Sequence, residues 1–193
     1  MLAPLAAVLL FLAAIVAAFG YLRLEEVERE QEAVKRDLEY AQQRLRLRLL
    51  ERQEQLMRLA RDISNKEMDP EEFMARAEAL VVQYPELQAI TWIDASRRII
   101  ASQVTPSLAA GNPWVAGEKL KPGDTETTFG LARDLLQPVY SQPAASTPTM
   151  PLLQLHTPLT EQGHFAGVIL GEYSIDNLLR LSLIHISEPT RPY

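Results

Sequence analysis

Side chains able to carry out chemistry are few in this chain of 193 residues. The three histidines, His156, His164 and His185, stand in no HExxH pattern, cysteine is absent, and no carboxylates have the spacing of metal ligands. The sequence also contains no Gly-x-Ser-x-Gly elbow and no glycine-rich phosphate loop. We therefore expect neither a catalytic residue nor a metal site in this segment, and a role in binding or signalling rather than catalysis.

The distribution of charge argues against nucleic-acid binding. The formal net charge is −6, and residues 69–180 hold 7 basic side chains against 13 acidic ones. Binding to a phosphate backbone requires a clustered positive footprint, which this region lacks.

The absence of cysteine is compatible with an oxidising compartment but does not require one. The positive-inside rule gives no orientation, because almost no chain precedes the first apolar segment.

The first apolar segment, residues 2–22, reads "LAPLAAVLLFLAAIVAAFGYL" and contains no charge. A helix of this length covers the roughly 30 Å of a bilayer's hydrocarbon core. The alternative is a cleaved signal peptide, whose apolar part is usually shorter and follows a basic residue. We therefore predict a transmembrane helix at residues 1–22.

Residues 23–68 predict a long amphipathic helix. Residues 23–63 contain no glycine or proline, and their apolar residues recur at steps of three, four and seven. Gln31 and Arg52 interrupt this apolar stripe, so strict heptads are not sustained. Two interpretations stay open: a seam that forms a coiled-coil-like dimer, and a helix that packs on its own domain.

Residues 69–180 predict an α+β domain. Asp69 and Pro70 form a helix start, and Pro85 ends that helix. Alternating apolar residues then predict one hairpin at 88–94 and 98–104 and another at 151–159 and 164–174, turning at Glu161-Gln162-Gly163. Between them, a proline-rich loop holds one short helix within residues 125–136. A sheet of four or five antiparallel strands with flanking helices results.

The first hairpin contains Trp92-Ile93-Asp94 followed by Arg97-Arg98, and the last strand contains "GVILG" at residues 167–171. With the order of elements given above, these motifs resemble the PAS-like (CACHE or PDC type) periplasmic sensor domain of bacterial membrane histidine kinases. The resemblance implies a protein of the bacterial inner membrane with a periplasmic sensor domain, a homodimer through residues 23–68, and passage of a signal across the membrane. It further implies a missing kinase module that uses ATP and magnesium and phosphorylates a response regulator.

The resemblance also implies ligand-binding residues. Related sensors surround a small anionic ligand with cationic and hydroxyl side chains from the sheet face and the long loop. The corresponding candidates here are Lys119, Arg133, His156 and Thr157. Each has a plainer interpretation: His156 as a half-exposed strand residue, Arg133 as the partner of a neighbouring carboxylate, and Lys119 as a solvated side chain.

Other parent proteins than a histidine kinase stay open. A chemoreceptor or a cyclic-dinucleotide enzyme would carry the same input domain, and a single-pass scaffold that binds a partner coiled coil would share the long helix. Residues 181–193, "LSLIHISEPTRPY", resemble a translated sequencing adapter. We therefore expect an N-terminal fragment whose sensor domain is incomplete, and we assign no role to His185.

Overall fold

The computed structural model describes residues 2–108, 114–120, 125–142, 144–145 and 151–183. Side chains are described from Glu32 onward, apart from residue 33 and a few positions beside the gaps. The chain divides into two compact units, residues 1–44 and 45–193. Helix α1, Leu2–Ser64, contributes residues to both. Of residues 181–193, only 181–183 lie within the described part, and His185 lies outside it.

The predicted membrane span at residues 2–22 falls in the part of α1 whose side chains are not described. Within the described residues, no helix is both long enough and apolar enough to cross a membrane. The span, the dimer seam and the domain boundaries at residues 22, 68 and 180 therefore stay predictions.

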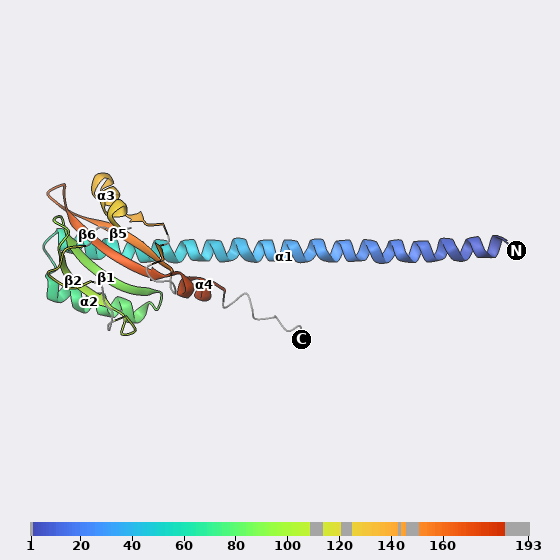
Figure 1. Cartoon of the computed structure of the whole chain (residues 1–193), viewed down its shortest axis with the longest axis horizontal. Helices are drawn as coiled ribbons and strands as arrows, with labels where there is room; N and C mark the ends of the chain where they lie inside the picture. Colours follow the sequence, from blue (N-terminus) through green and yellow to red (C-terminus); the bar gives the residue numbers. More distant parts are fainter. Residues whose placement is uncertain (1, 109–113, 121–124, 143, 146–150, 184–193) are drawn as a thin grey trace. The chain divides into compact units, whose positions relative to one another are not determined.

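The second unit is an α+β domain built on one antiparallel sheet (Figure 1). Its strands follow the spatial order β2-β1-β6-β5-β3, and β4 also pairs with β5. The elements after α1 are α2 (Pro70–Gln83), β1 (Leu87–Asp94), β2 (Ile99–Val104), α3 (Thr125–Leu135), β3 (Val139–Tyr140), β4 (Ala144–Ala145), β5 (Pro151–Glu161), β6 (His164–Ser174) and α4 (Ile175–Leu183). The predicted α+β class and both predicted hairpins are confirmed.

Local sequence explains where these elements begin and turn. The Asp69 carboxylate accepts a hydrogen bond from the Glu72 amide (2.8 Å), and Pro70 occupies the first turn of α2. In the β1–β2 turn, Asp94 Oδ1 accepts from Ser96 Oγ (2.7 Å) and from the Arg98 amide (2.8 Å). The β5–β6 turn places Gln162 and Gly163 at positive φ, 53° and 80°, as a two-residue hairpin connection requires.

The two short strands β3 and β4 were not predicted, because the proline-rich sequence between residues 106 and 158 indicates a loop there. Each pairs with β5 by main-chain hydrogen bonds, so the neighbouring strand rather than side-chain alternation places them there. Helix α4 was not predicted either; it begins directly after β6.

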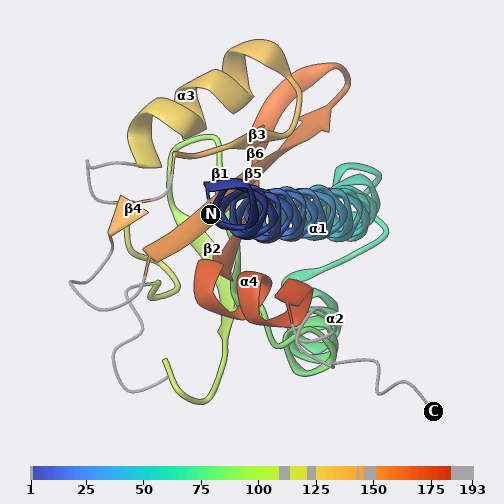
Figure 2. The same cartoon turned by 90° about the vertical axis from the view of Figure 1, so that its right-hand side faces the viewer.

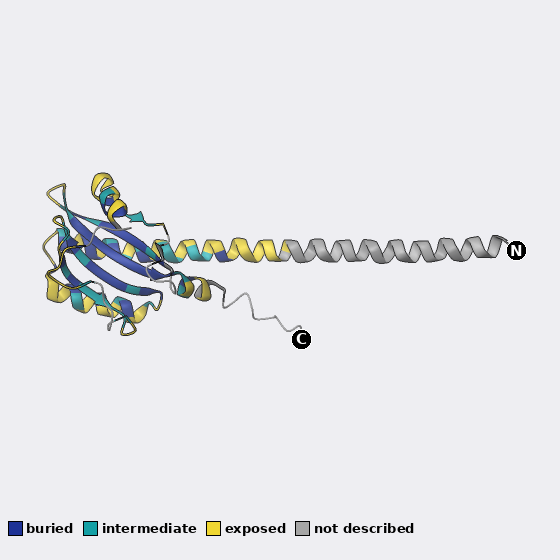
Figure 3. Ribbon diagram, in the orientation of Figure 1, coloured by how far each residue is buried: buried dark blue, intermediate teal, exposed yellow. Residues whose placement is uncertain are grey.

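The core has two layers, one on each face of the sheet (Figures 2 and 3). On the first face, Leu56 and Ile63 of α1 and Phe73 of α2 pack against β1, β5 and β6. On the second face, Phe129 and Ala132 of α3 pack against Ile93, Val168 and Leu170. The C-terminal turns of α1 therefore pack on the sheet domain, as one of the two interpretations of this helix proposed.

Candidate ligand-binding site

Strand alternation places the two predicted site residues of β5 on opposite faces of the sheet. His156 lies opposite Leu170 of β6, which belongs to the core layer under α3. Thr157 lies opposite Ile169, which belongs to the layer under α1. Both side chains are buried, His156 at 0% and Thr157 at 2% exposure.

A buried carboxylate lies on the α3-covered face, close to the end of β6. Glu172 is 5% exposed, and its cross-strand partner in β5 is Gln154, which is 6% exposed. Glu172 Oε1 accepts a hydrogen bond from Gln154 Nε2 (2.8 Å), and Oε2 accepts one from Trp114 Nε1 (2.6 Å). We call Glu172, Gln154 and Trp114 the Glu172 cluster.

Both of these donors to Glu172 are neutral, and no lysine or arginine in the described part of the chain forms an ion pair with it. Burial raises the pKa of the Glu172 carboxyl, while the bonds from Trp114 and Gln154 act in the opposite direction. Buried carboxylates are normally paired with a cation, because an isolated buried charge is costly. The cluster therefore offers an acceptor to a positively charged group.

His156 occupies the same face, two residues along β5 from Gln154. Neither ring nitrogen has a hydrogen-bond partner among the described residues. Burial lowers the pKa of His156 to about 4, so the ring is neutral at pH 7. A neutral imidazole has one donor and one acceptor, and here both are unused.

The structure does not gather the four predicted ligand residues into one site. Arg133 is exposed on α3, and its Nε donates to Asp134 Oδ1 (2.8 Å), which agrees with its plainer interpretation. Lys119 is exposed and takes part in a β-bridge with Arg98. His156 is fully buried rather than half-exposed. Whether any of the four contacts a ligand stays a prediction.

Sequence reasoning overlooked the Glu172 cluster, although a signal was present. In "HFAGVILGEYS" the glutamate interrupts an apolar strand, and two-residue alternation puts it on the face of Val168 and Leu170. Gln154 interrupts "PLLQL" in the same way. A charged residue at a core position of a strand indicates a functional or paired group.

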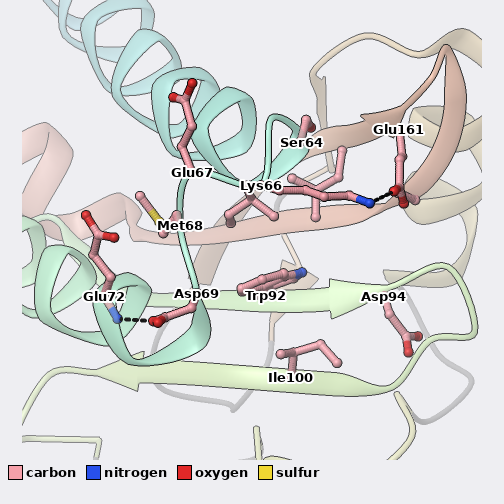
Figure 4. Close-up of a pocket in the computed structure, with 13 residues that line it drawn as sticks. Ser64, Lys66, Glu67, Met68, Asp69, Glu72, Trp92, Asp94, Ile100 and Glu161 are labelled. Atoms are coloured by element: carbon pink, nitrogen blue, oxygen red, sulfur yellow. Dashed lines mark hydrogen bonds and ion pairs between the residues drawn. The ribbon is translucent and has the colours of Figure 1, made fainter.

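A cavity of about 500 Å³ lies on the other face, where α1 ends and α2 begins (Figure 4). Trp92 lies in its interior and packs edge-on against Phe73. Its carboxylates are largely engaged within the fold: Asp69 caps α2, Asp94 holds the β1–β2 turn, and Glu161 pairs with Lys66. This cavity therefore carries less evidence for a ligand than the Glu172 cluster.

No protein-family model and no curated protein sequence matches the chain. Solved structures with the same fold were found. The extracellular domain of soHK1S-Z6, assigned as a histidine kinase, aligns at TM-score 0.61 and 14% identity, over 85% of this chain and 66% of that one. The ligand-binding domain of the Pseudomonas fluorescens chemoreceptor CtaA, in complex with L-serine, aligns at TM-score 0.52 and 18% identity, over 75% and 58%.

The ligand-binding domain of the Pseudomonas aeruginosa chemoreceptor PctC, in complex with GABA, aligns at TM-score 0.50 and 16% identity, over 67% of this chain. This chain spans 54% of the length of that domain. The fold of this chain is that of the extracellular ligand-binding domains of histidine kinases and chemoreceptors, a sensor-domain fold.

Proposed function

We propose that this chain is the extracytoplasmic sensory input region of a bacterial membrane signalling protein, and that it binds a small molecule carrying an amino group at the Glu172 cluster. The observation that carries this proposal is a buried carboxylate with only neutral donors, in a fold shared with extracellular ligand-binding domains.

The chemistry of the cluster favours an ammonium group. A cation that displaces or joins the neutral donors would form charge-assisted hydrogen bonds to Glu172, which are about twice as strong as neutral ones. Trp114 adds an aromatic surface, and His156 supplies a neutral donor and acceptor on the same face. The ligands in the two chemoreceptor structures, GABA and L-serine, both carry an amino group.

A sensor histidine kinase is our preferred parent protein, and a chemoreceptor is the second candidate. Strand β6 runs from Glu172 directly into α4, so a shift at the cluster has a short covalent route to this helix. Val34 and Leu38 of α1 are 67% and 66% exposed, which supports a partner helix and hence a dimer, or the scaffold alternative. In the kinase proposal, ATP, magnesium and the response regulator belong to the downstream module.

The test uses the full chain in detergent with Trp92→Phe, so that Trp114 is its one tryptophan. L-Serine, GABA and other amines, each with its N-acetyl analogue, are titrated while Trp114 fluorescence and thermal unfolding are followed. A binding amine should change the fluorescence and raise the melting temperature, because a ligand selective for the folded state stabilises it by mass action.

Glu172→Gln should weaken that binding by at least roughly tenfold, the loss expected for a charged hydrogen bond. The matched control is Glu78→Gln, an exposed glutamate on α2. Equal binding of the amine and its acetylated analogue, or unchanged binding in Glu172→Gln, would refute the proposed site.

A further inference from the structure

A second pocket, of about 450 Å³, lies on the sheet face opposite the Glu172 cluster. The last turns of α1 form one wall and the β5–β6 hairpin forms another. Leu136 and Pro138, which follow α3, also line it. Its polar lining includes Arg61 and Asn65 from α1 and its C-terminal turn, and Thr157 and Gln162 from the hairpin.

Among the described residues that line this pocket there is no aspartate or glutamate, although the chain as a whole has a net charge of −6. Arg61 lies where the pocket adjoins a groove between α1 and α2. The carboxylates of Asp62 and Glu54 on the same helix pair with Arg76 and Arg58 (2.6 and 2.8 Å). Among the described residues, Arg61 therefore forms no ion pair.

Thr157 supplies an independent indication of a ligand. Its side chain is 2% exposed, and its Oγ1 has no hydrogen-bond partner among the described residues. A buried hydroxyl without a partner costs free energy, so such groups are rare unless something absent from the protein satisfies them. The hydroxyl is able to donate to an anionic oxygen.

The two walls are held at a fixed distance by hydrogen bonds. Ser64 Oγ donates to the Ala60 carbonyl (2.7 Å) and accepts from the Thr160 amide (3.0 Å), which joins the end of α1 to β5. Lys66 and Glu161 form an ion pair between the same two segments. The backbone of the two walls is therefore held in place before any ligand arrives, which lowers the entropic cost of binding.

We propose that this pocket binds the carboxylate of a small organic acid. The planar guanidinium of Arg61 matches a carboxylate in geometry, and the hydroxyl of Thr157 and the amides of Asn65 and Gln162 supply neutral donors. Met57, Leu136 and Pro138 provide apolar surface for the body of the acid. The site is distinct from the Glu172 cluster, and neither proposal depends on the other.

The test follows ¹⁹F signals of 4-fluorobenzoate with the full chain in detergent, using empty micelles as the blank and 4-fluorobenzamide as the uncharged analogue. We expect saturable binding of the acid and much weaker binding of the amide. Arg61→Gln should weaken binding of the acid by roughly tenfold or more, and Thr157→Val by a few-fold. Arg46→Gln, an exposed arginine on the same helix, should change nothing.

Thr157→Val replaces the hydroxyl with a methyl group of similar volume and removes no hydrogen bond to the part of the chain that the structure describes. This variant should therefore fold, and it keeps the test valid if Arg61→Gln does not fold. Glu172→Gln should bind the acid normally, which separates failure of this proposal from failure of the amine site. Absence of saturable binding, equal binding of the amide, undiminished binding in Thr157→Val, or equally tight binding of inorganic phosphate would overturn it.

Discussion

Replacing Gly171 by alanine tests how α1 packs on the sheet. A Cβ atom at Gly171 would lie 2.5 Å from Leu56 Cδ1 and 3.3 Å from the Tyr173 ring. Carbon atoms in contact prefer about 3.5–4.0 Å, so the end of the Leu56 side chain would have to move by about 1 Å. Leu56 is 1% exposed, so that movement compresses its neighbours.

Overpacking of this kind costs about 1–3 kcal/mol of unfolding free energy. For a domain of this size, each kcal/mol lowers the melting temperature by about 2–4 °C. Leu56→Ala alone should cost about 2–5 kcal/mol, because it leaves a cavity. In the double variant the new methyl group enters that cavity, so we expect it to be no less stable than Leu56→Ala. Urea titration followed by circular dichroism measures all three values.

The matched control is Gly130→Ala in α3, where the added Cβ would meet no described atom within 4 Å apart from the adjacent residues and the helix's own backbone. This variant should gain up to about 1 kcal/mol, because alanine favours the helix. If Gly171→Ala were as stable as the parent chain, or if its cost simply added to that of Leu56→Ala, the proposed close contact between α1 and β6 would be wrong.

Two further predictions concern buried polar groups. The Glu86 carboxylate is 2% exposed and accepts a hydrogen bond from Arg52 Nε (2.9 Å), so Arg52→Met leaves a buried charge without its cation and should lower the unfolding free energy by about 3–5 kcal/mol. The double variant Arg52→Met with Glu86→Leu removes that charge and should recover most of the loss. An equal loss of unfolding free energy in both variants would contradict this prediction. The pKa of His156 is lowered from 6.5 to about 4, so the unfolded chain binds a proton that the folded chain does not. Stability should decline as pH falls from 6.5 to 4, by up to about 3 kcal/mol from this residue. Urea titrations at several pH values in this range should show that the unfolding free energy of His156→Leu depends less steeply on pH than that of the parent chain, and an unchanged pH dependence would contradict the prediction. Glu172, whose pKa is raised, contributes to the pH dependence in the opposite direction.

Several elements could be predicted from local sequence because short-range physics determines them. Asp69 caps α2 through an amide three residues away, and alternation in β5 and β6 requires only that one residue faces opposite to the next. The sequence analysis nevertheless grouped His156 and Thr157 as candidates for one site, and the structure places them on opposite faces of the sheet. Arg52 appeared only as an interruption in an apolar stripe, since its partner Glu86 lies 34 residues away.

The sequence by itself determined helices α1 to α3, the two hairpins and the alternation along their strands, because these depend on neighbouring residues and on side-chain periodicity. Only the tertiary structure decided which polar residues share a site. Glu172 meets Gln154 through strand register and Trp114 through a contact 58 residues distant. Arg61 and Thr157 line the same pocket because the end of α1 is bonded to β5. Such contacts depend on the packing of whole elements, which no local pattern encodes.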